Sequence, residues 1–380
     1  MSDKKNILII SGEPSGDMRA GELLKELKAL LPNAAFWGVG GEHMEQEGTE
    51  LIEHIRRLSM VGVWEVIKKL PRIREQYNTV IKNIRERKPD LAILVDYPGF
   101  NLRIAEALHR MNIPVIYYVI PQVWAWGRGR LKLLKQYVDM ALVLFKFEEE
   151  FLSQAGIDCE FVGHPLVDAS GALREGAVKT SGGEKFTIAL LPGSRKSEIL
   201  NMLPVMLDTA ERIHKDRKDI RFVIAENSHL ERALYDSALA GHEELALSRF
   251  TDDTFACLEK CDFAIVTSGT ATLETAIMEK PMVITYRAAI LTFILFRIFA
   301  RIPFIGLVNI IAGKEVAPEL LQGDATAEKL SEKVMDIIKD EARMNRMKDE
   351  LRKVKHSLGE KGASRRAAEA VNRFVQTRGL

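Results

Sequence analysis

The feature that most constrains the fold is an alternation of short apolar runs with helical patterns, which occurs in each half of the chain. Apolar runs of strand length lie at 7–10, 91–95 and 115–119, and again at 187–191 and 263–266. Strands that alternate with helices form a parallel sheet covered by helices on both faces. The sequence therefore predicts an α/β fold with two Rossmann-like, doubly wound parallel sheets.

A stretch without periodicity separates the two halves. Residues 169–184 are rich in Gly, Ser and Ala, which is typical of an interdomain connection. We expect one Rossmann-like domain over 1–168 and a second over 185–345. The last segment, 346–380, is charged and helical in pattern. We expect it to pack on the first domain or on a partner subunit.

Unusual loops follow the expected strands in both halves. They lie at 11–17, 96–101, 121–126, 192–198 and 268–270. In open parallel sheets, ligands bind beyond the carboxyl ends of the strands. If the two sheets face each other, all of these loops line one central cleft, which is the ligand-binding site that we predict.

Composition and local motifs exclude several classes of protein. The formal net charge is +1, whereas a nucleic-acid-binding surface usually shows as a basic excess. No segment matches GxxxxGK[ST], GxGxxG or HExxH, so we expect no P-loop, dinucleotide cofactor or metal site. The cysteines form no CxxC pair, and the first apolar run is too short for a signal peptide. We therefore expect a protein of a reducing, cytoplasmic compartment.

The segment DFAIVTSGTATLE, residues 262–274, has the pattern of a phosphate-binding loop. A strand runs into Ser268, Gly269 and Thr270, and a helix follows. Unpaired N–H groups at a helix N-terminus bind phosphate, and glycine permits close approach to the backbone. Glu274, one turn into the helix, can accept hydrogen bonds from ribose hydroxyls. The alternative is an ordinary strand–loop–helix unit with a solvated glutamate.

A second loop of this kind, LPGSRKSE, follows the first strand of the second half. Arg195 lies where a guanidinium could pair with both oxygens of a diphosphate. The alternative is a surface turn with a solvated arginine. The presence of two such loops in one half favours phosphate contact.

In the first half, Asp96 follows five apolar residues and precedes Tyr-Pro-Gly. A carboxylate at the mouth of a buried strand is partly desolvated, which suits it to general-base chemistry. It could equally be a turn-forming aspartate. In the first loop, Glu13 is a candidate for contact with substrate hydroxyls, whereas Asp17 could be a helix cap. His164 could contact a ligand or be a hydrogen-bonded hinge residue.

Two stretches have the composition of a lipid-facing surface. Residues 288–311 are strongly apolar, but Arg297, Arg301 and Pro303 interrupt them, so we reject a transmembrane helix. Residues 60–74 combine apolar side chains with Lys and Arg. The alternative for both is ordinary core packing. The expected lipid contacts are Val61, Val63, Trp64, Ile67, Phe293 and Phe296.

Together these loops resemble the lipid-A-disaccharide synthases, GT-B glycosyltransferases of Gram-negative lipopolysaccharide synthesis. The matching segments occur in the family's order and span most of the chain. They are SGEPSGD (11–17), DYPGFN (96–101), YYVIPQVWAW (117–126), FVGHPL (161–166), LLPGSRKSEI (190–199) and SGTATLE (268–274). The first and third are specific to the family, while the GSR and SGT loops are shared more widely among GT-B enzymes.

The resemblance implies a GT-B fold and a defined reaction. The donor would be UDP-2,3-diacylglucosamine and the acceptor 2,3-diacylglucosamine 1-phosphate (lipid X), joined into a β-1,6-linked disaccharide 1-phosphate with release of UDP. Family members are peripheral membrane proteins, which implies the cytoplasmic face of the inner membrane. The implied partners are these two lipids and that membrane surface, with a homodimer as a candidate assembly and no nucleic acid.

The resemblance also implies residue roles. Asp96 would be the general base. The UDP-binding residues would be Gly193, Ser194, Arg195, Ser268, Gly269, Thr270, Ala271, Thr272, Glu274 and Asn309. The acceptor-side residues would be Glu13, Ser15, Asp17, Asn101, Gln122 and Trp124. The chain departs from the family pattern at Ile120, where a serine is expected, and at Met18 and Arg19 after SGD; the departures concern acceptor-side detail.

Two other functions compete with this one. Another GT-B enzyme, such as a UDP-N-acetylglucosamine 2-epimerase, would share the UDP loops but would have no use for lipid-facing stretches. A non-catalytic, nucleotide-sensing membrane adaptor would bind UDP without turnover and would tolerate substitution of Asp96.

Overall fold

The computed structural model divides into two compact units. One comprises Met1–Pro165 with Glu360–Leu380, and the other comprises Leu166–Gly359. The described residues are 5–57, 63–125, 128–172, 185–287 and 303–380.

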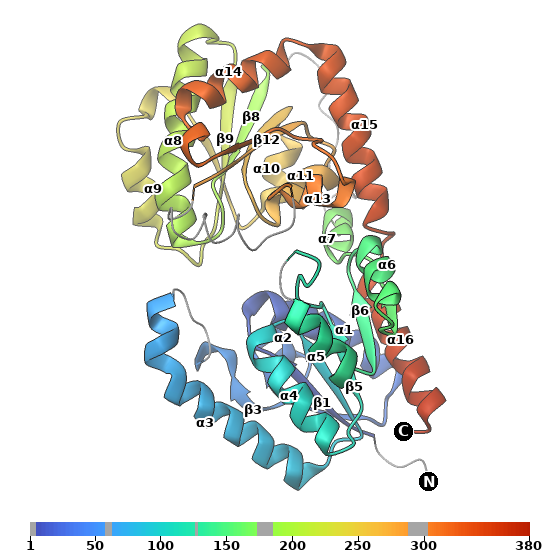
Figure 1. Ribbon diagram of the computed structural model, residues 1–380. Helices are drawn as coiled ribbons and strands as arrows, with labels where there is room; N and C mark the ends of the chain where they lie inside the picture. Colours follow the sequence, from blue (N-terminus) through green and yellow to red (C-terminus); the bar gives the residue numbers. More distant parts are fainter. Residues whose placement is uncertain (1–4, 58–62, 126–127, 173–184, 288–302) are drawn as a thin grey trace. The chain divides into compact units, whose positions relative to one another are not determined.

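The first unit is built on a seven-stranded parallel sheet with the order β3-β2-β1-β4-β5-β6-β7 (Figure 1). Its strands are β1 Asn6–Ser11, β2 Ala35–Gly40, β3 Glu50–His54, β4 Leu91–Val95, β5 Val115–Tyr118, β6 Met140–Val143 and β7 Cys159–Phe161. Its helices are α1 Pro14–Leu30, α2 Glu42–Gln46, α3 Val63–Arg87, α4 Pro98–Arg110, α5 Arg128–Tyr137, α6 Lys146–Gln154 and α16 Ala363–Arg378, with a 3₁₀ turn, η1 Ile55–Arg57.

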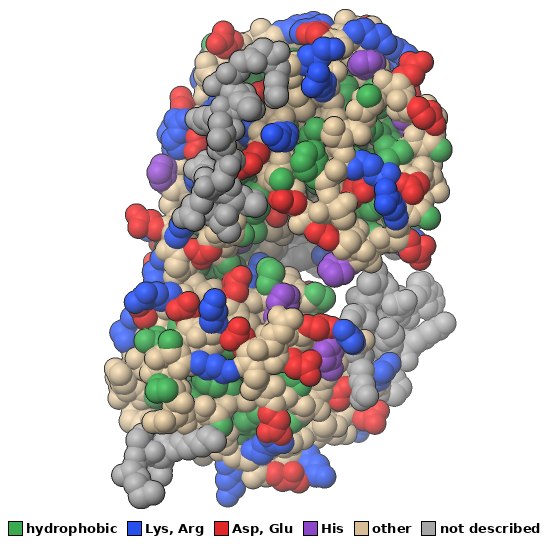
Figure 2. Space-filling model, turned by 180° about the vertical axis from the view of Figure 1, so that it is seen from behind, with side chains coloured by type: hydrophobic (Ala, Val, Ile, Leu, Met, Phe, Trp, Pro, Cys, Tyr) green, Lys and Arg blue, Asp and Glu red, His purple; other side chains and the backbone are tan. Residues whose placement is uncertain are grey.

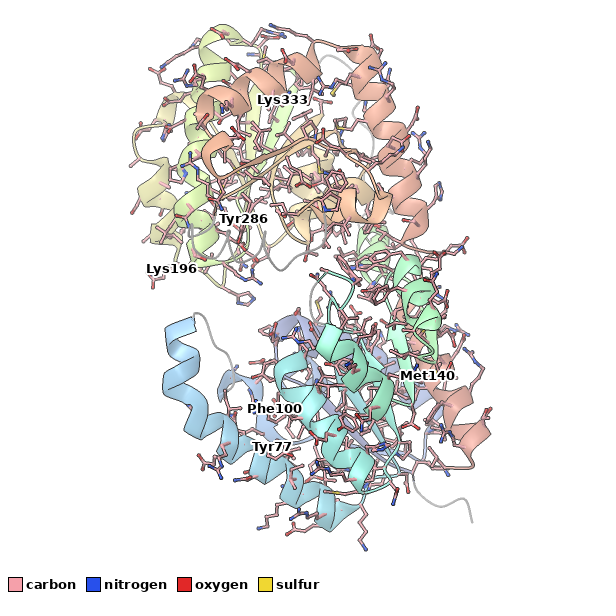
Figure 3. The ribbon with its side chains drawn as sticks, viewed as in Figure 1. Tyr77, Phe100, Met140, Lys196, Tyr286 and Lys333 are labelled. Carbon is pink, nitrogen blue, oxygen red and sulfur yellow. The ribbon has the colours of Figure 1, made fainter. Side chains whose placement is uncertain are left out.

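The central strands of this sheet are apolar on both faces. All five residues of β4 are buried, as expected for a parallel strand covered by helices on either side. Helices α3 and α4 meet through Tyr77 and Phe100, whose rings lie edge to face with centroids 6.3 Å apart (Figure 3). The strand order reverses between β1 and β4, so the loops after these two strands flank the switch point where α/β sheets bind ligands.

The last helix of the chain belongs to the first unit. Helix α16 packs against α1, and Figure 1 shows it as the final red helix, ending near the C-terminus. Several polar contacts hold it in place. Arg366 Nε donates to the Val162 carbonyl at 2.8 Å, Ser364 bonds Glu22 at 3.1 Å, Arg373 pairs with Glu160, and Arg378 pairs with Asp139. The preceding helix, α15, belongs to the second unit.

The second unit is built on a six-stranded parallel sheet with the order β10-β9-β8-β11-β12-β13. Its strands are β8 Thr187–Leu191, β9 Arg221–Glu226, β10 Ser248–Thr251, β11 Phe263–Thr267, β12 Met282–Tyr286 and β13 Glu319–Leu321. Its helices are α7 Leu166–Ala172, α8 Lys196–Asp216, α9 Arg232–Leu239, α10 Thr254–Glu259, α11 Ala271–Ile277, α13 Leu307–Ala312, α14 Ala327–Ile338 and α15 Glu341–Ser357, with 3₁₀ turns η2 Glu243–Leu245 and η3 Gln322–Asp324.

This sheet also has a switch point. Strands β8 and β11 are adjacent and fully buried, and β8 is bordered on its other side by β9. The loops after these three strands therefore emerge at one edge of the sheet, where a ligand site is expected.

Acidic and basic side chains are mixed over the face of the molecule that Figure 2 shows, in keeping with the net charge of +1. Within the described residues, no helix is both long and apolar enough to cross a membrane.

Candidate active site

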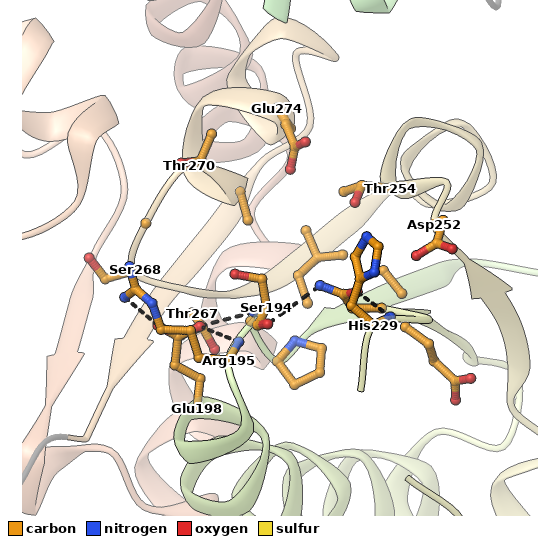
Figure 4. Close-up of a pocket in the computed structure, with 18 of the residues that line it drawn as sticks. Ser194, Arg195, Glu198, His229, Asp252, Thr254, Thr267, Ser268, Thr270 and Glu274 are labelled. Atoms are coloured by element: carbon orange, nitrogen blue, oxygen red, sulfur yellow. Dashed lines mark hydrogen bonds and ion pairs between the residues drawn. The ribbon is translucent and has the colours of Figure 1, made fainter. Parts of the chain in front are cut away.

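The second unit contains a cavity of about 570 Å³ at the carboxyl ends of its central strands (Figure 4). It is lined by the loops after β8, β9, β10 and β11 and by the starts of α10 and α11. The lining includes Pro192, Gly193, Ser194, Arg195, Glu198, Asn227, His229, Asp252, Thr254, Thr267, Ser268, Gly269, Thr270, Ala271 and Glu274. Both loops that the sequence marks as phosphate-binding thus border one cavity.

The loop after β8 is organised by Glu198, which the sequence reasoning missed. Its carboxylate accepts the N–H groups of Ser194 at 2.9 Å and Arg195 at 3.2 Å, and so caps α8. Gly193 has φ +108°, and a Cβ there would lie 2.4 Å from the Glu198 carboxylate, so glycine is required. In the sequence, the sign of this helix cap was a glutamate three residues after the N-cap residue.

Arg195 is the N-cap residue of α8 and lines the same cavity. Its Nη1 lies 3.1 Å from Glu198 Oε1, yet its side chain is 71% exposed. The guanidinium therefore keeps most of its donors available to a ligand, while one ion pair restricts its position.

The loop after β11 presents free backbone donors to the cavity. Within the described part of the chain, the N–H groups of Gly269, Thr270 and Ala271 make no hydrogen bond. The buried hydroxyl of Thr267 also lacks a partner there. Ser268 donates its hydroxyl to the Ile305 carbonyl at 2.8 Å, which fixes the loop. Several unsatisfied donors around one space are suited to an oxyanion.

Two of the residues expected at the UDP site are internal supports in this geometry. Thr272 is fully buried and donates to the Gly269 carbonyl at 2.8 Å. Asn309 is also fully buried and does not line the cavity. Its amide bonds the backbone of Val316 and Ala317 and the carboxylate of Glu319. These contacts leave its side chain no free group for a ligand.

Glu274 lines the cavity and has no partner within the described residues. Burial raises its pKa to about 7, since no neighbouring cation or donor offsets the desolvation. Near neutral pH its carboxyl group is therefore divided between the acid, which can donate a hydrogen bond, and the carboxylate, which can accept several.

In the first unit, Asp96 lies at the end of β4 in a strained backbone conformation. Asp96 and Tyr97 have φ of +51° and +48°, a region that non-glycine residues seldom adopt. The Asp96 carbonyl accepts hydrogen bonds from Asn101 Nδ2 at 2.8 Å and from the Tyr117 hydroxyl at 2.7 Å. These bonds hold the strained turn in place.

The Asp96 carboxyl group is half-buried. Its Oδ1 accepts the Tyr97 N–H at 2.9 Å, and its Oδ2 lies 4.0 Å from Arg19 Nη1. Burial raises the pKa of Asp96, and the nearby Arg19 charge opposes that rise. Such a carboxylate is suited to accept a proton.

The acceptor-side residues fall into two groups. Glu13 and Ser15 are exposed at the start of α1, and Gln122 is exposed in the loop after β5. Asp17 is buried, and its carboxylate accepts the N–H groups of Gly41, His43 and Met44 at the start of α2. It is therefore a cap, but of a helix other than its own.

Asn101 is buried as well. Its Nδ2 lies within hydrogen-bond distance of the main-chain oxygens of Ile10, Val95 and Asp96. In this geometry it ties the ends of β1 and β4 together and supports Asp96.

Trp124 is held by another residue that the sequence reasoning missed. Its indole N–H donates to Glu148 Oε1 at 2.9 Å, and Glu148 also accepts the Phe145 N–H at 3.3 Å. Burial raises the pKa of Glu148 to about 7. The indole also packs edge to face on Phe147, with centroids 5.1 Å apart. A buried carboxyl group at the start of α6 thus anchors the loop after β5.

His164 is buried beside Phe145, with ring centroids 5.4 Å apart. Burial, together with the charge of Arg19, lowers its pKa to about 3. The imidazole is therefore neutral at physiological pH.

Val61, Phe293 and Phe296 lie outside the described residues, and the side chains of Val63, Trp64 and Ile67 at the start of α3 are likewise outside them. Among the described residues, no three His, Cys, Asp or Glu side chains are grouped closely enough to hold a metal ion.

Comparison with known proteins assigns the family. A family model described as "Lipid-A-disaccharide synthetase" matches residues 7–374. The chain belongs to the lipid-A-disaccharide synthase family. A lipid-A-disaccharide synthase of Myxococcus xanthus is 38% identical to this chain, and the alignment covers 98% of each of the two proteins. Lipid-A-disaccharide synthase 1 of Legionella pneumophila (strain Philadelphia 1) is also 38% identical, and that alignment covers 94% of each protein. The family resemblance is confirmed, and the chain is a glycosyltransferase.

Solved structures share the fold of this synthase family at low sequence identity. The UDP-GlcNAc 2-epimerase of Neisseria meningitidis, solved with UDP-GlcNAc, has a TM-score of 0.66 at 11% identity, covering 97% of this chain and 100% of its own. The glycosyltransferase of kitacinnamycin has a TM-score of 0.64 at 16% identity, covering 98% and 99%. These likenesses concern the fold alone, and they confirm a GT-B fold of two Rossmann-like domains.

Proposed function

We propose that this chain transfers a diacylglucosamine unit from UDP-2,3-diacylglucosamine to 2,3-diacylglucosamine 1-phosphate. The products are the β-1,6-linked disaccharide 1-phosphate and UDP. The observation that carries the proposal is the family match over residues 7–374, together with relatives that align along nearly the whole chain.

The cavity of the second unit is the proposed UDP site. Its volume of about 570 Å³ is within the usual range for small-molecule sites. The diphosphate would accept hydrogen bonds from the free N–H groups of 269–271 and from Arg195. The ribose hydroxyls would bond Glu274, which is one turn further along α11. The Thr267 hydroxyl, which is buried and has no partner among the described residues, is a further polar group beside the proposed diphosphate.

Asp96 is the proposed general base. It removes the proton of the acceptor 6-hydroxyl while that oxygen attacks the anomeric carbon of the donor. The bond between that carbon and the UDP oxygen breaks, and UDP leaves with an added negative charge. Arg195 and the N–H groups of 269–271 stabilise this charge as it develops. Each turnover inverts the anomeric centre.

The proposed location is the cytoplasmic face of the inner membrane, where both acylated substrates would reside. The support is chemical: the stretches 60–74 and 288–311 combine apolar and basic residues, as interfacial segments do. Flotation with anionic phospholipid vesicles is expected to carry the protein upward at low salt. Protein that stays at the bottom of the gradient at every salt concentration would contradict this location.

The reaction itself is tested with purified protein and both acylated substrates. UDP release is followed together with mass spectrometry of the lipid products, and a disaccharide 1-phosphate is expected only when donor and acceptor are both present. EDTA is expected to leave the rate unchanged. Conversion of UDP-N-acetylglucosamine to its epimer would favour the epimerase alternative, and UDP binding without any product would favour the adaptor.

A further inference from the structure

Arg19 lies on α1 and is one of the residues at which the chain departs from the family pattern. Its side chain is only 15% exposed. Within the described part of the chain it makes no hydrogen bond, and its one ion-pair contact is Asp96 Oδ2 at 4.0 Å. A guanidinium that is largely withdrawn from water is expensive unless a negative charge lies nearby. Asp96 is the negative charge that the structure provides.

The two carboxylate oxygens of Asp96 have different surroundings. Oδ1 accepts the Tyr97 N–H at 2.9 Å. Oδ2 has Arg19 as its nearest cationic neighbour and accepts no hydrogen bond within the described residues. Oδ2 is therefore the oxygen that remains available to accept a proton, and Arg19 is adjacent to it.

Other polar groups near Asp96 contact its main chain instead. The Tyr117 hydroxyl on β5 and Asn101 Nδ2 on α4 both bond the Asp96 carbonyl. Burial raises the pKa of Tyr117 well above its usual range, so its hydroxyl stays neutral. The positive charge of Arg130, on α5, acts to lower the pKa of Tyr117, whereas it is not among the groups that shift the pKa of Asp96.

Among the described residues, the remaining neighbours bring no second positive charge to the Asp96 carboxylate. Burial, and to a lesser extent the charge of Glu13, raises the pKa of Tyr97, which therefore also stays neutral. His164 faces Arg19, and its pKa of about 3 leaves it uncharged over the working pH range. Of the cations that the structure describes, Arg19 is thus the one that acts on the Asp96 carboxylate.

We infer that Arg19 is a positioning residue that supplies the counter-charge for Asp96 and so keeps this carboxylate ionised. The inference rests on the proposed role of Asp96 as the general base. A base must be unprotonated to accept the hydroxyl proton. Burial favours the protonated carboxyl group, and the neighbouring positive charge favours the ionised one. Without Arg19, the carboxyl group would keep its proton up to a higher pH.

The test compares pH profiles of kcat/KM for the acceptor between the wild type, Arg19→Gln and Arg19→Lys. In Arg19→Gln the acidic limb that belongs to Asp96 is expected to move upward by about one pH unit, with activity approaching the wild-type level at high pH. Arg19→Lys is expected to restore most of the shift, because it keeps the charge. Lys25→Gln removes the same charge from an exposed position on the same helix and is expected to move nothing.

Several outcomes would overturn the inference. An unmoved acidic limb in Arg19→Gln would do so. A rise in KM for the phosphorylated acceptor that is equal at every pH would instead assign Arg19 to the acceptor phosphate. A lower melting temperature with no change in the profile would leave only a structural role.

The failure of the proposed base can be recognised separately, with Asp96→Asn. If that variant keeps a near-normal rate, Asp96 is not the base, and the inference about Arg19 falls with it. If Asp96→Asn is inactive while the Arg19→Gln profile is unshifted, only the inference about Arg19 fails.

Discussion

Asp96 and Tyr97 share an unusual feature, because two consecutive non-glycine residues have positive φ at the end of a buried strand. Such conformations cost roughly 1–3 kcal/mol each and persist where the surroundings enforce them. Here Asn101 and Tyr117 both bond the Asp96 carbonyl. Backbone strain and a half-buried carboxylate at one strand end are together a physical reason to place the base here.

Arg195 allows a direct test of the UDP site. Replacing it with alanine removes the charged donor that we expect to contact the diphosphate, while α8 keeps its Glu198 cap. Calorimetry is expected to show UDP affinity weakened by about 1.5–3 kcal/mol, the range for a hydrogen bond to a charged group.

The matched control is Arg232→Ala, which removes an exposed arginine at the start of α9. Its UDP affinity is expected to equal that of the wild type. Equal affinities for Arg195→Ala and the wild type would exclude a diphosphate contact by Arg195.

Among the elements, the central strands of each sheet gave the clearest signal in the sequence. The runs 91–95, 187–191 and 263–266 coincide with β4, β8 and most of β11, because strands covered on both faces read as continuous apolar runs. The sheet edges are different. Strands β3 and β13 contain Glu50, Glu53 and Glu319 beside few apolar residues, so they give no comparable signal.

The loops were located correctly by their positions after strands, but the roles of their polar side chains could not be read in the same way. Asp17 and Asn101 lie in marked loops and Asn309 lies on α13, and all three bond backbone groups inside the protein. A sequence shows that a polar residue is near a strand end. It does not show whether a neighbouring backbone or a ligand satisfies that residue, because this depends on contacts distant in sequence.

The contacts of Glu148 predict how the loop after β5 responds when this side chain is removed. Glu148→Ala removes the acceptor of the Trp124 indole N–H and one cap of α6, so we expect a loss of about 1–3 kcal/mol in stability. The loop is also expected to become less ordered, which would raise KM for the acceptor while UDP affinity stays unchanged. Steady-state kinetics and UDP calorimetry on the same preparation measure both effects.

Glu150→Ala is the control, since it removes an exposed glutamate from the same helix. This variant is expected to change neither the stability nor the KM for the acceptor. An unchanged acceptor KM in Glu148→Ala would show that this anchor has no bearing on the acceptor side.

At the scale of the whole molecule, Glu274 predicts a pH dependence of stability. Its pKa is raised from 4.5 to about 7 in the folded protein. Between these values the folded state binds more protons than the unfolded state, so the stability that Glu274 contributes is full below about pH 4.5 and is lost as pH rises through about 7. Glu274→Gln removes this titration.

Thermal melting of the wild type and Glu274→Gln at pH 5 and pH 8 measures the effect. The variant is expected to gain melting temperature relative to the wild type on going from the lower to the higher pH. A difference between the two proteins that is the same at both pH values would mean that Glu274 titrates as it does in an unfolded chain.

The central claim is that Asp96 is the base of a glycosyl transfer whose leaving UDP is bound in the second unit. The most direct test measures disaccharide formation and UDP affinity for Asp96→Asn beside the wild type. We predict turnover lower by roughly a hundredfold or more, with UDP bound as tightly as before. A variant that forms the disaccharide at a near-normal rate would contradict the claim.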